Sequence, residues 1–340
     1  MKFGVFDHMD RGTASLVEQY KSRLKLAEAY DVAGLYAYHL AEHHSTPLGM
    51  APSPSVYLSA VIQRTKRLRV GAMVYTLSMH HPLRVFEEIC MLDQMSEGRL
   101  EVGLGRGASP FEIAYYGVNP EQAQSIYQES FEIIMQSLKE AEVSFHGKHF
   151  RFDHVPVEMH CYQESGPPLW YGLGSPDGAR WVAEKRINII CSGTADRVRS
   201  ITDRYRAEWD DLGREKSAIP LMGASRHVVI GRTTKEAKEA AARAYRVWYR
   251  SLMHLWFKNN SKPKALPFPS EFEEAQAAGL AIAGNADEVR EWLWEQAEAM
   301  GVNYLVCRFA FGDLTHSESL RSVDLFASEV VPQFQTEGAA

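Results

Sequence analysis

The chain has 340 residues, of which 45% are hydrophobic and 24% charged, and this composition is typical of a globular protein with a sizeable core. The formal net charge of -6 argues against general nucleic-acid binding, and the absence of an 18-residue apolar stretch argues against a membrane span. Four scattered cysteines without a CxxC pair favour buried thiols over disulfides or a zinc cluster. Residues 2–6 indicate a strand rather than a signal peptide, so we expect a cytoplasmic protein.

The first third of the chain alternates strands and helices with a period of roughly thirty residues, which is typical of βαβ units around a parallel sheet. The expected strands are residues 2–6, 35–40, 68–77 and 100–105. The expected helices are residues 13–33, 55–64 and 82–95. Gly34 is placed to end the first helix, and Pro82 to begin the third.

An insertion at 108–167 interrupts this alternation. It contains an expected helix at 121–141, followed by a polar–apolar alternation at 143–159 that indicates a hairpin. The alternation of strands and helices then resumes. The later strands are expected at 169–173, 187–191, 226–231 and 303–309, and the later helices at 176–185, 195–212, 234–257, 286–300 and 317–334.

Eight strands, each followed by a helix, predict a (β/α)8 TIM barrel with an insertion after strand 4, and an open doubly wound sheet is the alternative. We expect one domain over residues 1–340. Residues 258–272 carry Lys and Pro without periodicity and predict a long loop after strand 7, which is a candidate lid.

Polar side chains follow the second and third expected strands. Glu42, His43 and His44 follow the second strand, and His80 follows the third, so all four are expected at the C-terminal mouth of the barrel, where side chains meet substrate. A solvated loop with surface histidines is the alternative. We expect no metal, because the chain has neither an HxH after strand 1 nor an HExxH helix. A serine hydrolase is disfavoured because no G-x-S-x-G elbow is present.

Two glycine-rich strand ends are candidate ligand sites. Residues 103–108 satisfy a G-x-G-x-x-A pattern, but Pro110 interrupts the helix that a dinucleotide site needs. The missing side chains instead suit the approach of a flat ligand, with Arg106 as an anion ligand or simply a solvated residue. Gly174 and Ser175 precede a helix and favour either a phosphate site or an ordinary N-cap.

Two further residues are weaker candidates. Tyr127 lies on the helix of the insertion, and Arg308 lies on the last strand. The ordinary alternatives are a buried core tyrosine for the first and a salt-bridged arginine for the second.

Taken together, these motifs resemble those of the bacterial luciferase-like, flavin-dependent monooxygenases over nearly the whole chain. The points of resemblance are Ala-Glu-His-His at 41–44, His-Pro-Leu-Arg at 81–84, Leu-Asp-Gln-Met-Ser-Glu-Gly-Arg at 92–99, Val-Gly-Leu-Gly-Arg-Gly at 102–107, Pro-Pro-Leu-Trp at 167–170 and the Gly-Ser turn that follows.

The resemblance implies that FMN binds at the C-terminal mouth. It assigns His43 as the catalytic histidine near the reacting face of the flavin, with Glu42 beside it. Met73 and Val74 match the place of a non-prolyl cis peptide beneath the isoalloxazine. The residues implied at the phosphate are Arg106, Tyr127, Gly174, Ser175 and Gly178, and those expected to contact substrate are His44, His80 and Arg308.

Three residues depart from the family pattern. Gly105 stands where light-emitting members carry a reactive cysteine, so nothing here supports bioluminescence. Gly178 replaces a hydroxyl residue of some members, which weakens one phosphate contact. Ser45 stands where many members have a phenylalanine, which indicates a different substrate pocket.

The implied activity is that of a monooxygenase in which reduced FMN and O2 oxygenate a small, fairly apolar substrate through a C4a-(hydro)peroxyflavin. The implied partners are a separate flavin reductase and a second copy of the chain in a homodimer. Three alternatives remain: a deazaflavin (F420)-dependent oxidoreductase that transfers hydride, a non-catalytic flavin-binding protein, and a metal-dependent barrel hydrolase.

Overall fold

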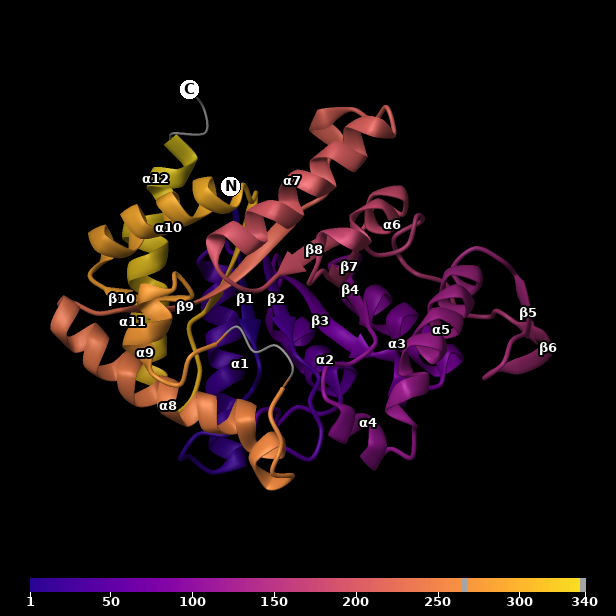
Figure 1. Ribbon diagram of the computed structural model, residues 1–340, viewed down its shortest axis with the longest axis horizontal. Helices are drawn as coiled ribbons and strands as arrows, with labels where there is room; N and C mark the ends of the chain where they lie inside the picture. The colour runs from indigo at the N-terminus through magenta and orange to yellow at the C-terminus, as the bar shows by residue number, and fades with distance from the viewer. Residues whose placement is uncertain (264–267, 337–340) are drawn as a thin grey trace.

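The computed structural model describes residues 1–263 and 268–336, and within them eight parallel strands close into a barrel surrounded by helices (Figure 1). The barrel strands are β1 (Lys2–Asp7), β2 (Ala37–Leu40), β3 (Arg69–Thr76), β4 (Leu100–Gly105), β7 (Leu169–Gly172), β8 (Asn188–Cys191), β9 (Met222–Ile230) and β11 (Tyr304–Arg308). Strand β9 closes the barrel because it pairs with β8 on one side and with β11 on the other. The predicted (β/α)8 barrel is therefore confirmed.

The N-terminal end of the barrel is held by a buried carboxylate. Glu101 of β4 is fully buried and accepts hydrogen bonds from the Tyr36 hydroxyl at 2.5 Å, from Arg69 Nε at 2.6 Å and from the Trp170 indole N–H. In this fold, such contacts at the N-terminal end contribute stability, and the chemistry takes place at the opposite end.

Helices cover the outside of the barrel. They are α1 (Leu16–Val32), α2 (Pro54–Arg64), α3 (Pro82–Met95), α6 (Ala179–Glu184), α7 (Ala195–Asp211), α8 (Thr234–Lys258), α10 (Ala286–Met300), α11 (His316–Leu325) and α12 (Val331–Thr336). Capping boxes at Ser15, Asn285 and Thr315 begin three of them. The single helix expected at 317–334 instead contains a π-helical turn at Phe326–Val330. Among the described residues, no helix is both long enough and apolar enough to span a membrane.

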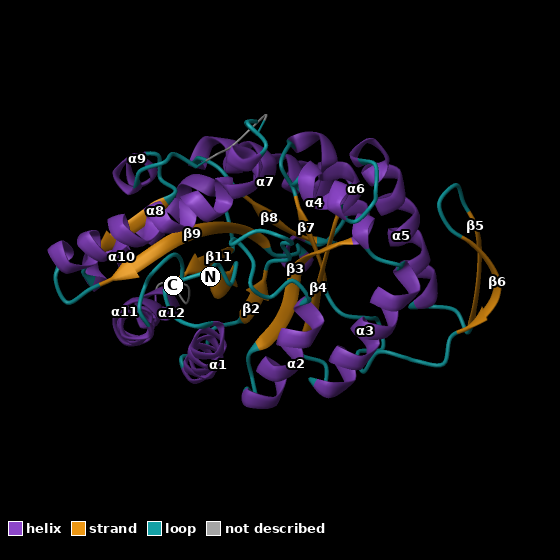
Figure 2. Cartoon of the chain, turned by 90° about the horizontal axis from the view of Figure 1, so that it is seen from below, coloured by secondary structure: helices purple, strands orange, loops and turns teal. Residues whose placement is uncertain are grey.

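The insertion after β4 contains two helices, α4 (Pro110–Tyr115) and α5 (Ala123–Ser137), and a hairpin. The hairpin strands β5 (Glu142–His146) and β6 (Arg151–Pro156) pair antiparallel, as predicted, and project away from the barrel (Figure 2). Helix α4 was not predicted, because its six residues are too few to show a helical period.

The connection between β9 and β11 differs from the prediction. Helix α8 extends to Lys258, and a second helix, α9 (Phe272–Ala277), leads into a short extra strand, β10 (Ala281–Gly284). Strand β10 pairs with the C-terminal half of β9 outside the closed barrel. Its four residues, Ala-Ile-Ala-Gly, are too few to show an alternation typical of a strand. The loop expected at 258–272 includes residues 264–267, which lie outside the described residues, and its role as a lid stays a prediction.

Candidate active site

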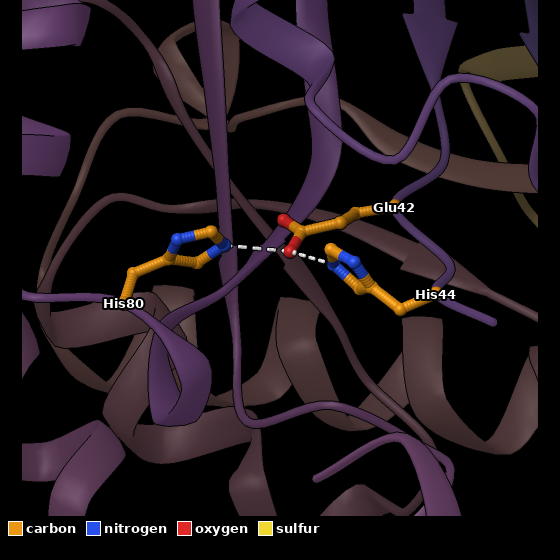
Figure 3. A group of neighbouring side chains, drawn as sticks. All are labelled: Glu42, His44 and His80. Atoms are coloured by element: carbon orange, nitrogen blue, oxygen red, sulfur yellow. Dashed lines mark hydrogen bonds and ion pairs between the residues drawn. The ribbon is translucent and has the colours of Figure 1, made fainter. Parts of the chain in front are cut away.

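Glu42 joins the ends of two neighbouring strands at the C-terminal mouth. Its Oε1 lies 2.7 Å from His44 Nε2 and 2.6 Å from His80 Nε2, so the carboxylate stands between the two imidazoles (Figure 3). Its Oε2 accepts a hydrogen bond of 3.0 Å from the backbone N–H of Thr76, the last residue of β3. Glu42, His44 and His80 are thus brought together as predicted.

The charge of this cluster follows from its contacts. Burial alone would raise the pKa of Glu42, but the hydrogen bonds from His44 and His80 outweigh it and lower that pKa to about 2. Burial lowers the pKa of His80, but the hydrogen bond to Glu42 and its negative charge reverse this effect, and the pKa of His80 is raised overall. Glu42 is therefore an ionised carboxylate that favours the protonated form of His80.

The same three side chains are close enough to hold a metal ion, since their ligand atoms lie within 4.8 Å of one another. However, both imidazoles already meet one carboxylate oxygen through short hydrogen bonds, which a metal would have to replace. The other nitrogen of His44, Nδ1, lies 2.7 Å from the Tyr116 hydroxyl. The expectation of no metal stays a prediction.

His43 is held by a residue that the sequence analysis did not single out. Its Nδ1 lies 3.2 Å from Oε1 of Glu112, and Oε2 of Glu112 accepts a hydrogen bond of 2.8 Å from the backbone N–H of His44. The His43 side chain is 20% exposed, whereas Glu112 is buried. Ser109, the N-cap of α4, accepts a hydrogen bond from the Glu112 amide, and this Ser-x-x-Glu spacing was the available signal.

A second group of side chains at the mouth comes from the residue after β1 and from β9, α8 and β11. The imidazole of His8 stacks on that of His43 with a centroid separation of 5.6 Å, and the Trp248 indole N–H donates to His8 Nδ1 at 3.4 Å. Arg308, the last residue of β11, lies 3.5 Å from both ring nitrogens of His227. His8, His227 and Trp248 carried no motif that would have identified them in the sequence.

A cavity of about 910 Å³ lies between the insertion helix α5 and the loop that follows β7. Tyr127, Gly174, Ser175 and Gly178 all line it, so four of the five expected phosphate residues are brought together. The Tyr127 hydroxyl is buried and has no hydrogen-bond partner among the residues that the structure describes. The fifth residue, Arg106, is exposed, is not among the residues that line the cavity, and directs its Nε toward the Gly107 carbonyl at 3.4 Å.

The remaining expected cofactor residues lie on β3. The peptide bond between Met73 and Val74 is cis, as the resemblance implied. The Val74 side chain packs against Gly105 of β4, and a Cβ at Gly105 would collide with it. This contact is a reason for Gly105 to be glycine here.

The closed parallel barrel and the cluster of polar residues at the C-terminal ends of its strands define the chain as a (β/α)8-barrel protein with a candidate active site in the usual place for this fold. The chain belongs to the luciferase-like monooxygenase family, whose family model matches residues 1–304.

Two relatives cover nearly all of the chain. The uncharacterized protein y4wF of Sinorhizobium fredii is 40% identical over 97% of this chain and 96% of its own length. The oxygenase component of the flavin-dependent trigonelline monooxygenase of Acinetobacter baylyi is 25% identical over 98% of this chain and 96% of its own. The family membership and the trigonelline monooxygenase component support an oxidoreductase of the monooxygenase type.

Two solved structures share the fold. The oxygenating constituent of 3,6-diketocamphane monooxygenase from Pseudomonas putida, in complex with FMN, has a TM-score of 0.82 at 20% identity and covers 98% of each chain. The coenzyme F420-dependent tetrahydromethanopterin reductase of Methanopyrus kandleri has a TM-score of 0.71 at 17% identity, covering 98% of this chain and 99% of its own. The same fold therefore occurs with both kinds of cofactor.

Proposed function

We propose that this chain is the oxygenase component of an FMN-dependent monooxygenase that uses O2 to oxygenate a small organic substrate. The observation that carries the proposal is the cavity lined by Tyr127, Gly174 and Ser175, in a chain of the luciferase-like family. A separate reductase supplies the reduced flavin, and the enzyme acts in the cytoplasm as a homodimer.

The residues that line the cavity fit the phosphate end of FMN. Outside the adjoining residues, no atom lies within 4 Å of the position that a Cβ of Gly172 would take, and only Arg197 Nη2, at 3.9 Å, comes that near for Gly174. The backbone is therefore open to close approach by a ligand. The buried Tyr127 hydroxyl lacks a partner that a phosphate oxygen would supply, and Lys185 adds a cation to the same cavity.

Reduced FMN supplies the electrons that activate O2 for insertion into the substrate. The protein contributes a proton carrier and an environment with little water. His43 is partly exposed at the mouth and holds or moves the proton at Nε2, while Glu112 at Nδ1 fixes the orientation of the ring. Met73 and Val74 provide apolar surface from β3 for the flat part of the flavin.

The test is an anaerobic titration of the purified chain with reduced FMN, followed by rapid mixing with oxygenated buffer. We expect saturable binding and a reoxidation rate for bound flavin that differs from that of free flavin. Tyr127→Phe removes the unpartnered hydroxyl and should weaken binding by about tenfold. Tyr115→Phe, at an exposed tyrosine of α4, is the matched control and should leave binding unchanged.

Three results would contradict the proposal. Binding of reduced F420 but not of reduced FMN would assign the chain to the hydride-transferring oxidoreductases. Stoichiometric metal together with no flavin binding would favour a metal-dependent hydrolase. Flavin binding with a reoxidation rate equal to that of free flavin would favour a non-catalytic flavin-binding protein, and an unchanged rate in a His43→Gln variant would remove only the proposed role of His43.

A further inference from the structure

Arg308 is a buried guanidinium that has no carboxylate partner in the part of the chain that the structure describes. Its relative exposure is 4%, its Nε has no hydrogen-bond partner, and among the described residues no carboxylate forms an ion pair with it. Two other buried or half-buried arginines are paired with carboxylates, since Arg23 lies 3.2 Å from Asp7 and Arg69 lies 2.6 Å from Glu101. A buried charge without a counter-ion is unfavourable unless something else provides one.

The neighbours of Arg308 offer apolar surface and neutral hydrogen-bonding groups. The rings of Phe6, Trp248 and Phe268 lie 5.0 to 5.6 Å from its guanidinium carbon. Burial, with the nearby charge of Arg308, lowers the pKa of both His8 and His227 well below the ordinary value, so both imidazoles are neutral. The group as a whole therefore carries a single positive charge.

Asp10, an acid whose charge acts on Arg308, forms no ion pair with it. Asp10 interacts with Arg308 only at longer range, and burial raises the pKa of its carboxyl group to about 7. The Asp10 carboxylate instead accepts a hydrogen bond of 2.6 Å from the Gly312 amide. Arg308 is therefore left without an anionic partner among the described residues.

This charge lies beside the proposed reaction site. The His43 ring stacks on His8, the Phe6 ring lies 4.8 Å from His8, and Arg308 lies over Phe6. A molecule held by Arg308 would extend along these rings toward His43. The Trp248 indole can only donate, so His8 Nδ1 is the acceptor of their hydrogen bond. The proton of neutral His8 is therefore on Nε2, where it offers a second hydrogen-bond donor beside Arg308.

We infer that Arg308 recognises the substrate through a carboxylate group, and that the substrate is a monocarboxylate with an apolar or aromatic body. The single positive charge balances one negative charge rather than the two of a phosphate monoester, and the planar guanidinium matches a planar carboxylate. This inference rests on the proposed function, because it names the substrate class of the same site.

The test compares carboxylates with neutral molecules of the same shape. The dissociation constants of 3-phenylpropionate and octanoate are measured by calorimetry against those of 3-phenylpropan-1-ol and octan-1-ol, with and without reduced FMN under anaerobic conditions. We expect the wild-type chain to bind each carboxylate at least about tenfold more tightly than the matching alcohol. Arg308→Met should abolish this preference, and Arg308→Lys should retain part of it.

Arg226→Met is the matched control. Arg226 lies on the neighbouring strand β9 and is also buried, but its guanidinium bonds to Gln296 and to the Ser225 carbonyl, so its loss should leave the carboxylate preference intact. Thermal midpoints of all variants establish that they are folded. A wild-type chain that binds carboxylates no better than alcohols, or that binds neither, would overturn the inference. A preference that survives Arg308→Met would do the same.

Three further results test this inference, and the last two of them separate it from the proposed function. Inorganic phosphate that binds at Arg308 more tightly than the carboxylates would overturn the assignment to a carboxylate and indicate a phosphoryl group. Reduced FMN that binds and reoxidises as expected without any carboxylate preference would refute only the role of Arg308. A carboxylate preference without flavin binding would support Arg308 and refute the proposed function.

Discussion

Glu42 shows how one buried side chain stabilises the mouth of the barrel. Its carboxylate is bonded to two imidazoles and to the backbone of β3, so it ties β2 to β3 at the end where the candidate site lies. Its nearly complete burial makes a direct contact with substrate or flavin difficult in this conformation. The structure thus favours a positioning role for Glu42, and its expected catalytic role stays a prediction.

Replacement of Glu42 should reduce stability in a pH-dependent way. Glu42→Gln leaves a protonated His80 without its partner and should lower the free energy of unfolding by about 3 kcal/mol near pH 5.5, measured by urea denaturation. The pKa of Glu42 is lowered from 4.5 to about 2, so its contribution is present above pH 4.5 and is lost as the pH falls toward 2. The pKa of His80 is raised above 6.5, so its contribution is present below pH 6.5 and is lost as the pH rises through the raised pKa.

The difference in the free energy of unfolding between wild type and Glu42→Gln should therefore be largest between about pH 4.5 and pH 6.5. Glu28→Gln serves as the control, because Glu28 forms an exposed ion pair with Arg64 that should contribute no more than about 1 kcal/mol. A difference that stays constant from pH 3 to pH 8 would show that the two ionisations are not linked to folding.

At the scale of elements, glycines allow β3 and β4 to pack closely beneath the candidate flavin site. A Cβ at Gly103 would stand 3.1 Å from Met73 Cα, and one at Gly105 would meet the Val74 side chain. The pairing also shifts register between Ala72 and Tyr75. The glycine pattern that the sequence analysis related to a flat ligand thus has a second cause, which is the packing of one strand on the next.

Gly105→Ala should lower the free energy of unfolding by about 2 kcal/mol, because the added methyl group overpacks this contact. Val74→Ala in the same chain should recover about 1 kcal/mol of that loss, which a double-mutant cycle of urea denaturation measures. Gly172→Ala on β7, where no atom beyond the adjoining residues lies within 4 Å, is the control and should not be destabilising. Strict additivity of the Gly105 and Val74 changes would refute the contact.

At the scale of the whole molecule, closure of the barrel depends on the start of β9. Asn303 Oδ1, just before β11, accepts a hydrogen bond of 2.7 Å from the Met222 amide, and Asn188 Oδ1 of β8 accepts one of 2.8 Å from the Leu221 amide. Each asparagine joins β9 to one of its two barrel neighbours. These bonds also explain why β9 begins at Met222, four residues before the predicted start.

Asn303→Ala should lower the free energy of unfolding by about 2 kcal/mol, because it leaves the buried Met222 amide without its acceptor. Urea denaturation measures the loss, and amide hydrogen exchange should show faster exchange at Met222. Asn259→Ala, at an exposed asparagine that bonds within the end of α8, should cost only about 0.5 kcal/mol. Unchanged stability of Asn303→Ala would mean that closure depends on strand packing alone.

The sequence by itself determined the elements and the order in which they occur. Hydrophobic periods of two and 3.6 residues indicate strands and helices, and glycines and prolines indicate where these elements begin and end. The eight barrel strands, most of the helices and the hairpin could therefore be predicted. The expected second and third strands also placed Glu42, His44 and His80 together, because parallel strands end at one mouth.

Only the tertiary structure decided which distant side chains meet. Glu112 reaches His43 across 69 positions in the sequence, and Trp248 reaches His8 across 240. That no carboxylate of the described residues pairs with Arg308 likewise depends on where every neighbouring element packs. Local patterns in the sequence indicate whether a residue is buried. They do not indicate which residues surround it, because that depends on the path of the whole chain.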